Sequence, residues 1–185
     1  MLIPQAIVQQ GGSTGFVQID DQLLGSAGTF DFTSIPQTYL HLRIEYQARA
    51  SDVAAAVAIV MQLNGDSGNT YYSQLVNFHD VTTTASEFLA SSAGRCGVVP
   101  AAGAGSANLA GAGTIEIPNY TSTSWYQNFL CHNIYGVSGA SQDTVEYLTG
   151  GWWENVAAVT QVTLLASPGT TFAIGSRATL FGIGA

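Results

Sequence analysis

Apolar and polar residues alternate along much of the chain, with the period of two that is typical of a β-strand having one buried and one solvated face. The alternation is clearest in residues 39–46 (YLHLRIEY). It returns in residues 57–63, directly ahead of the turn-forming sequence NGD, and residues 72–78 after that turn are the expected partner strand. These segments predict antiparallel strands that pack one face on a core.

Other segments carry the same signal in a different form. Residues 125–134 alternate, but both of their faces contain apolar side chains, which indicates a central strand or one covered by a neighbouring subunit. The C-terminal third predicts three strands, at residues 144–153, 159–165 and 172–183. Residues 91–113 consist almost entirely of Gly, Ala and Ser, and this composition predicts a long surface loop.

The dipeptide Ile-Pro, followed by a tyrosine, occurs twice, in residues 35–39 (IPQTY) and residues 117–120 (IPNY). Proline lacks a ladder donor and therefore ends a strand, while a tyrosine ring covers the corner and its hydroxyl ties the loop. Two such crossings predict an all-β antiparallel sandwich that is jelly-roll-like. We expect a single sandwich domain over residues 16–185, preceded by a short N-terminal arm, residues 1–15.

The charge composition limits the partners of this domain. Only 9% of the residues are charged, lysine is absent, and the formal net charge is −8. Without a basic patch the chain has no means of displacing phosphate counterions, so nucleic acid is not an expected partner. Lysine is depleted from interface centres whereas arginine is enriched there. The composition therefore predicts a subunit packed against neighbours, with a habit of the source genome as the alternative. The four cations are Arg43, Arg49, Arg95 and Arg177.

No residue pattern indicates an enzyme, a metal site or a cofactor. Cys96 and Cys131 lie far apart without metal-ligand spacing, one in the predicted loop and the other in a strand, and are expected to be free thiols. The calcium-like sequence NGDSGN has one carboxylate and is interpreted as a hairpin loop. His79-Asp80 has no accompanying nucleophile motif, and the carboxylates form no evident acid–base pair. A histidine repeated around an oligomer axis stays open as the metal-binding alternative.

No apolar run is long enough to span a membrane, and the N-terminus lacks the basic region of a signal peptide. We therefore expect no membrane partner and assembly in the cytoplasm of a host cell.

A set of short motifs connects the chain to a family. They are FDFTSIPQTYLHLRIEYQAR (30–49), LNGDSGNTY (63–71), IEIPNY (115–120), GWW (151–153), TLL (163–165) and GSRATLFGI (175–183). In these motifs the chain resembles β-sandwich virion structural proteins of tailed bacteriophages. Some of those domains are head-decoration (cement) proteins and others are tail-fibre or receptor-binding proteins, usually trimeric. The resemblance implies a virion protein without catalytic residues.

The leading hypothesis is a capsid decoration protein that binds the major capsid protein on the outer surface of the phage head as a homotrimer and stabilises the shell. Residues on both faces of the segment around 125–134 are the candidate oligomer interface: Trp125, Tyr126, Phe129 and His132. The apolar N-terminal arm, followed by a glycine-rich hinge, is the candidate capsid-attachment device through Leu2, Ile3, Pro4, Ile7 and Val8.

The alternative is a tail receptor-binding protein that recognises host surface glycan. In that case aromatic side chains would stack on sugar rings, and the candidates are Tyr71, Tyr72, Trp152 and Trp153.

Overall fold

The computed structural model describes residues 15–54, 56–101, 108–136, 144–167 and 169–184. These residues form strands and connecting turns without a helix, which confirms the predicted all-β class. The strands are β1 (Phe16–Leu23), β2 (Phe30–Phe32), β3 (His41–Ala48), β4 (Ala56–Leu63), β5 (Tyr71–His79), β6 (Thr82–Ser91), β7 (Gly94–Pro100), β8 (Gly111–Pro118), β9 (Gln127–Gly136), β10 (Thr144–Trp153), β11 (Val162–Ala166) and β12 (Arg177–Ile183).

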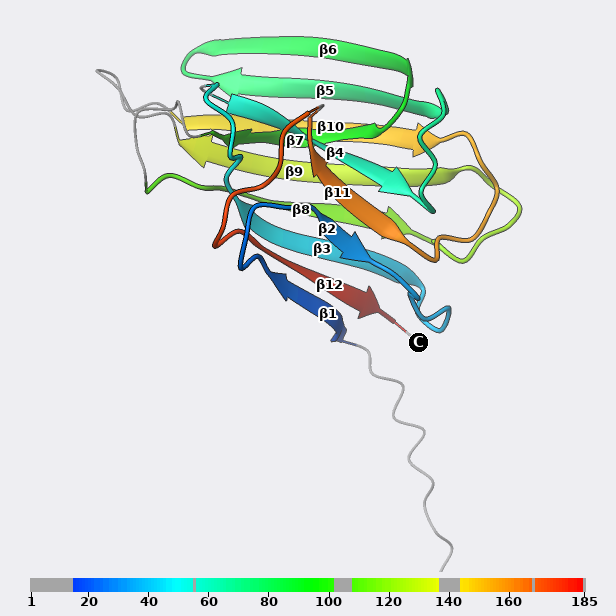
Figure 1. Ribbon diagram of the computed structural model, residues 1–185. Coiled ribbons are helices and arrows are strands. Elements are labelled where there is room, and N and C mark those ends of the chain that lie inside the picture. The colour runs from blue at the N-terminus through cyan, green and yellow to red at the C-terminus, as the bar shows by residue number, and fades with distance from the viewer. Residues whose placement is uncertain (1–14, 55, 102–107, 137–143, 168, 185) are drawn as a thin grey trace, which may run out of the picture.

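The strands build two antiparallel sheets that pack face to face (Figure 1). The four-stranded sheet has the order β2-β11-β4-β7, and the eight-stranded sheet has the order β1-β12-β3-β8-β9-β10-β5-β6. Within them, β1 pairs with β12, β2 with β11, β3 with β8, and β4 with β7. This nesting of first with last strands is the jelly-roll arrangement, so the predicted jelly-roll-like sandwich is confirmed.

Two hairpin-like insertions enlarge the jelly roll. Strands β5 and β6 come between β4 and β7 in the chain, and β9 and β10 come between β8 and β11. All four join the larger sheet as β9-β10-β5-β6, which places β6 at its outer edge (Figure 1). We call these four strands the sheet extension.

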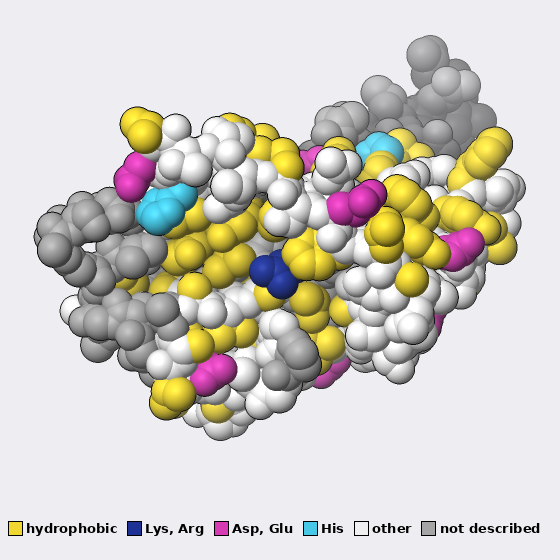
Figure 2. Space-filling view, turned by 90° about the horizontal axis from the view of Figure 1, so that it is seen from above, with side chains coloured by type: hydrophobic (Ala, Val, Ile, Leu, Met, Phe, Trp, Pro, Cys, Tyr) yellow, Lys and Arg dark blue, Asp and Glu magenta, His cyan; other side chains and the backbone are white. Residues whose placement is uncertain are grey.

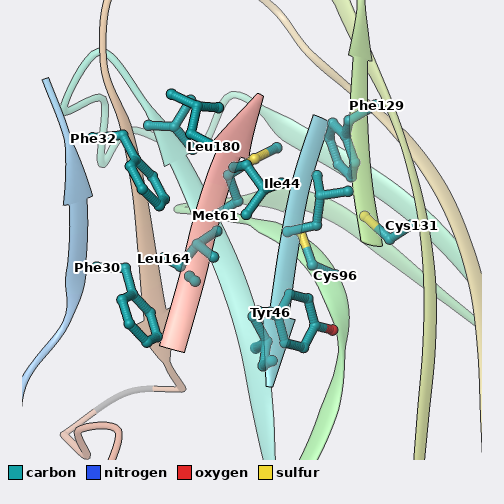
Figure 3. Close-up of a cluster of buried hydrophobic side chains, with 14 of the residues drawn as sticks. Phe30, Phe32, Ile44, Tyr46, Met61, Cys96, Phe129, Cys131, Leu164 and Leu180 are labelled. Carbon is teal, nitrogen blue, oxygen red and sulfur yellow. The ribbon is translucent and has the colours of Figure 1, made fainter. Parts of the chain in front are cut away.

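The core lies between the two sheets and is filled from alternate positions of each strand. Phe30 and Leu164 come from the smaller sheet, and Ile44, Phe129 and Leu180 come from the larger one (Figure 3). All are at most 1% exposed. Burial of this size accounts for the strict alternation seen in the sequence, because a shift by one residue would move every core side chain into solvent.

The two Ile-Pro corners meet in space. Ile35 and Ile117 are buried, and the hydroxyl of Tyr120, whose ring is fully buried, donates a hydrogen bond to the carbonyl of Pro36. The predicted role of the second tyrosine, covering a corner and tying a loop, is therefore confirmed. Tyr39 is partly buried against the core.

The glycine-rich region was wrongly predicted as one long loop, because its first part is strand β7. Gly94 and Gly97 are required there for close packing: an added Cβ would lie 2.7 Å from a ring atom of Phe129 at Gly94, and 2.7 Å from Asn133 at Gly97. Small residues thus let the backbone of β7 approach the side chains of β9. Cys96 consequently lies in a strand and not in a loop.

Candidate functional site

The sheet extension exposes several large apolar side chains on the face that points away from the core, with polar residues such as Gln74 and His132 between them. Strand β9 alternates cleanly, with Phe129 buried and Leu130 exposed by 58%. On the neighbouring strand, Leu148 is 46% exposed and is in register with His132 of β9 and Val76 of β5. We call this surface the outer apolar face, and its largest exposed members are Phe78, Leu89, Leu130, Ile134, Leu148 and Trp152.

Several ionisable side chains beside this face contact one another. His132 Nε2 lies 2.6 Å from Glu146 Oε1, and both side chains are about half exposed. Arg43 lies 3.2 Å from Glu116 and 3.1 Å from Glu45. Arg43 thus offsets part of the negative charge of Glu45 and Glu116 beside the outer apolar face.

Two shallow hollows, each about 610 Å³, mark the face around Gly150. The missing side chain at this position leaves space, since an added Cβ would come no closer than 3.6 Å to Leu130. One hollow contains Leu130 and Leu148, and the other contains Tyr72 and Trp152. A side chain or an aromatic or sugar ring of a binding partner could fit into these hollows.

The half-buried Tyr72 and the exposed Trp152 form an aromatic pair at one end of the face. Their rings are stacked with centroids 5.0 Å apart and an interplanar angle of 9°. The Tyr72 hydroxyl donates a hydrogen bond of 3.1 Å to Glu154, and this bond raises the pKa of Tyr72. The pair offers an aromatic surface bordered by a carboxylate, an arrangement suited to stacking and hydrogen bonding with a polar ring.

The other two candidate stacking residues were wrongly assigned to the surface, because they face the core. Tyr71 is fully buried; its hydroxyl accepts a hydrogen bond from the amide of Leu63 (2.8 Å) and donates one to the carbonyl of Asp66 (3.1 Å). Trp153 is 1% exposed, and its indole nitrogen donates to the Asp66 carboxylate at 2.7 Å. Both residues hold the turn after β4 and cannot reach a glycan.

Of the four candidate interface residues, three lie on the surface and one is buried in the core. Trp125 is 73% exposed and Tyr126 is 48% exposed, both just before β9. His132 lies on the outer apolar face. Phe129 is completely buried, so its assignment to an interface was wrong. The sequence reasoning missed Leu130 and Ile134, although the apolar residues on both faces of this segment were the signal that could have identified them.

Among the residues that the structure describes, no three His, Cys, Asp or Glu side chains come together in a group that could hold a metal ion. Cys96 and Cys131 are buried free thiols, as expected. The Asp66 carboxylate accepts hydrogen bonds from Trp153, Gly68 and Thr70, which lower its pKa. This carboxylate therefore holds the calcium-like loop together. The prediction of a hairpin with residues 72–78 as the partner strand was wrong, because β4 and β5 lie in different sheets and the loop crosses from one sheet to the other.

The candidate attachment arm, with Leu2, Ile3, Pro4, Ile7 and Val8, lies outside the described residues. Within those residues the structure contains no helix that is long and apolar enough to cross a membrane. No family model, no curated protein and no solved structure matches this chain.

Proposed function

We propose that the protein is a structural subunit of a phage virion, a capsid decoration protein that binds the major capsid protein on the outer surface of the head as a homotrimer. The observation that carries this proposal is the outer apolar face. Soluble monomers rarely expose contiguous apolar patches larger than a few hundred Å², and larger patches mark interaction surfaces. The assignment to a phage virion rests on the sequence resemblance to virion β-sandwich proteins.

A closed homo-oligomer is the assembly that this surface favours. Strand β6 is an exposed edge of ten residues, which leaves unpaired backbone groups beside the apolar side chains. Such edges invite further association unless they are protected, and the chain has no lysine to protect them. Cyclic closure covers these groups without open-ended growth.

The test of assembly is light scattering on the purified protein at micromolar concentration. We expect a trimer for the natural chain and a monomer for the double variant Leu130→Lys/Leu148→Lys, because lysine is depleted from interface centres. Ile174→Lys is the matched control: this leucine-sized side chain is 70% exposed and lies just before β12, away from the sheet extension. It should leave the mass unchanged. A natural chain that is monomeric, or a double variant that stays trimeric, would contradict the proposed interface.

The test of location is binding to undecorated capsids. Deletion of residues 1–10 should leave folding and oligomeric mass unchanged and weaken capsid binding at least tenfold, about 1.4 kcal/mol. Quantitative mass spectrometry of virions should find hundreds of copies per particle. A few dozen copies would place the protein in the tail instead.

A second function, recognition of host surface glycan by a tail protein, is favoured by the stacked pair Tyr72 and Trp152. Trp152→Ala should then abolish binding to host cells while leaving the oligomeric mass unchanged. Unaltered cell binding by this variant would remove the support for the second function.

A further inference from the structure

A separate hollow of about 380 Å³ lies on the outside of the smaller sheet, where the sheet extension passes beside it. Its apolar wall includes Val60 of β4, Leu165 of β11 and Phe88 of β6. Arg95 of β7 also lines it, and the amide of this residue donates to the hydroxyl of Ser73 on β5 at 3.1 Å. Figure 2 shows one face of the molecule, on which a cationic side chain is surrounded by hydrophobic ones.

Arg95 differs from the other arginines in its partners. Arg43 pairs with glutamates, Arg177 binds Asp21 at 2.6 Å, and Arg49 donates to the carbonyl of Leu109. Like Arg43, whose guanidinium lies 5.4 Å from the Phe16 ring, Arg95 lies over an aromatic ring, that of Phe88 at 5.1 Å, and its buried Nε has no hydrogen-bond partner. Across the residues that the structure describes, no carboxylate is paired with it.

An unpaired cation of this kind is unusual, because a partly buried charge without a partner carries a desolvation penalty. Burial lowers the pKa of Arg95, but arginine stays protonated in proteins. The contact with Phe88 orients the guanidinium and leaves its hydrogen-bond donors unused. The missing component is an anion that accepts from those donors.

We infer that this hollow binds the carboxylate of a small acidic sugar. Arginine presents a planar fork that matches a carboxylate with two parallel hydrogen bonds. One cation balances one negative charge, and the net charge of −8 disfavours a phosphate dianion. The volume falls within the range of about 300–1,000 Å³ found for small-molecule sites.

The remaining lining fits the body of such a ligand. Ser91 and Ser92 bring hydroxyl groups to the hollow that can both donate to and accept from sugar hydroxyls. The Thr170 hydroxyl already donates to the carbonyl of Ser167 at 3.0 Å and is left as an acceptor. Gln62 already donates to the carbonyl of Ser92 at 3.0 Å, which leaves its amide oxygen as an acceptor. The apolar wall covers the carbon face of the ring. The argument for this site does not use the proposed assembly, because the outer apolar face lies on the other side of the sheet extension.

The test is isothermal titration calorimetry of the full chain with glucuronate, its methyl glycoside, glucose and inorganic phosphate. We expect glucuronate to bind, and glucose and phosphate to bind at least tenfold more weakly. Binding of the methyl glycoside would assign the site to a sugar at the end of a glycan, and its rejection would assign the site to a free sugar acid. Absence of glucuronate binding, or equal binding of glucose or phosphate, would overturn the inference.

Variants of the cation test the same site independently. Arg95→Gln should weaken glucuronate binding at least tenfold, whereas Arg177→Gln, which removes an exposed arginine at another strand, should leave it unchanged. Equal affinity of Arg95→Gln and the natural chain would refute the role of Arg95. The four-ligand comparison on the natural chain decides the proposal even if Arg95→Gln does not fold.

Discussion

Replacement of Gly151 by alanine should weaken the fold at the centre of the sheet extension. An added Cβ would lie 2.4 Å from the Phe129 ring and 2.4 Å from the backbone carbonyl oxygen of Tyr72. The ring cannot retreat freely, because Gly94 on the opposite sheet already holds it: a Cβ there would be 2.7 Å away. Relief therefore requires β10 and β5 to move apart or Phe129 to leave its place in the core.

The expected loss follows from two opposing effects. Overpacking of a filled core costs about 1–3 kcal/mol, and displacement of a strand backbone puts Gly151→Ala at the upper end of that range. Alanine also restricts the unfolded chain, which returns about 0.4–1 kcal/mol. The net loss is about 2 kcal/mol in the free energy of unfolding. For a chain of this length that loss lowers the melting temperature by about 4–8 °C.

The adjacent glycine provides the control on the same strand. Gly150 faces outward, and an added Cβ there makes only an ordinary contact of 3.6 Å with Leu130. Gly150→Ala should therefore melt at or slightly above the temperature of the natural chain. The measurement is thermal unfolding followed by tryptophan fluorescence at one fixed protein concentration. Equal melting temperatures for the two variants, or a greater loss at Gly150, would refute the packing described for Phe129.

Two further predictions concern the Asp66 carboxylate and the two cysteine thiols. Asp66→Ala should lose about 1–3 kcal/mol of stability because it leaves the indole nitrogen of Trp153 without an acceptor, and Asp66→Asn should lose less; urea unfolding measures both. The pKa of Asp66 in the folded state lies below its ordinary value of 3.8, so this carboxylate's contribution is complete above that pH and declines as the pH falls below it. The role of Asp66 would be contradicted if acid left the tryptophan fluorescence of the natural chain unchanged although both variants unfolded at a lower urea concentration than the natural chain. Burial raises the pKa of the Cys131 thiol, and Cys96 is fully buried, so both should resist a thiol reagent at pH 8 until urea unfolds the chain. Rapid labelling of the folded protein would show that the core is more open than described.

The alternation of apolar residues was sufficient to predict the strands that bury one face. Strands β3, β4, β9 and β10 fall close to their predicted ranges, because their inward side chains fill the core. Strand β6 gave no such signal, since nearly all of its residues are exposed on both faces. The alternation did not reveal strand β7, because glycines interrupt it. These glycines are needed because the side chains of β9 pack directly on the backbone of β7.

The sequence predicted the strands β5, β9 and β10 that carry the candidate site, but not the direction of their side chains. Neighbouring residues of a strand point to opposite faces, so only one member of each aromatic pair in Tyr71-Tyr72 and Trp152-Trp153 can be exposed. Contacts between distant segments determine which member of each pair is buried. Asp66 accepts a hydrogen bond from the indole of Trp153, and the Tyr71 hydroxyl accepts one from the backbone of β4 at Leu63. Composition alone could not supply that choice. Nor could it identify Arg95 as unpaired, because its pairing depends on which strands surround it.

Both candidate surfaces arise from the same two insertions. The strands β9, β10, β5 and β6 continue the larger sheet and carry the outer apolar face on one side. On the other side β6 passes beside the smaller sheet, and Phe88 closes a wall of the hollow around Arg95. The packing of Phe129 against Gly94 and Gly151 ties β9 to β7 and to β10. Loosening of that contact by Gly151→Ala should therefore disturb both surfaces together, whereas lysines on the outer apolar face should alter assembly and leave the hollow intact.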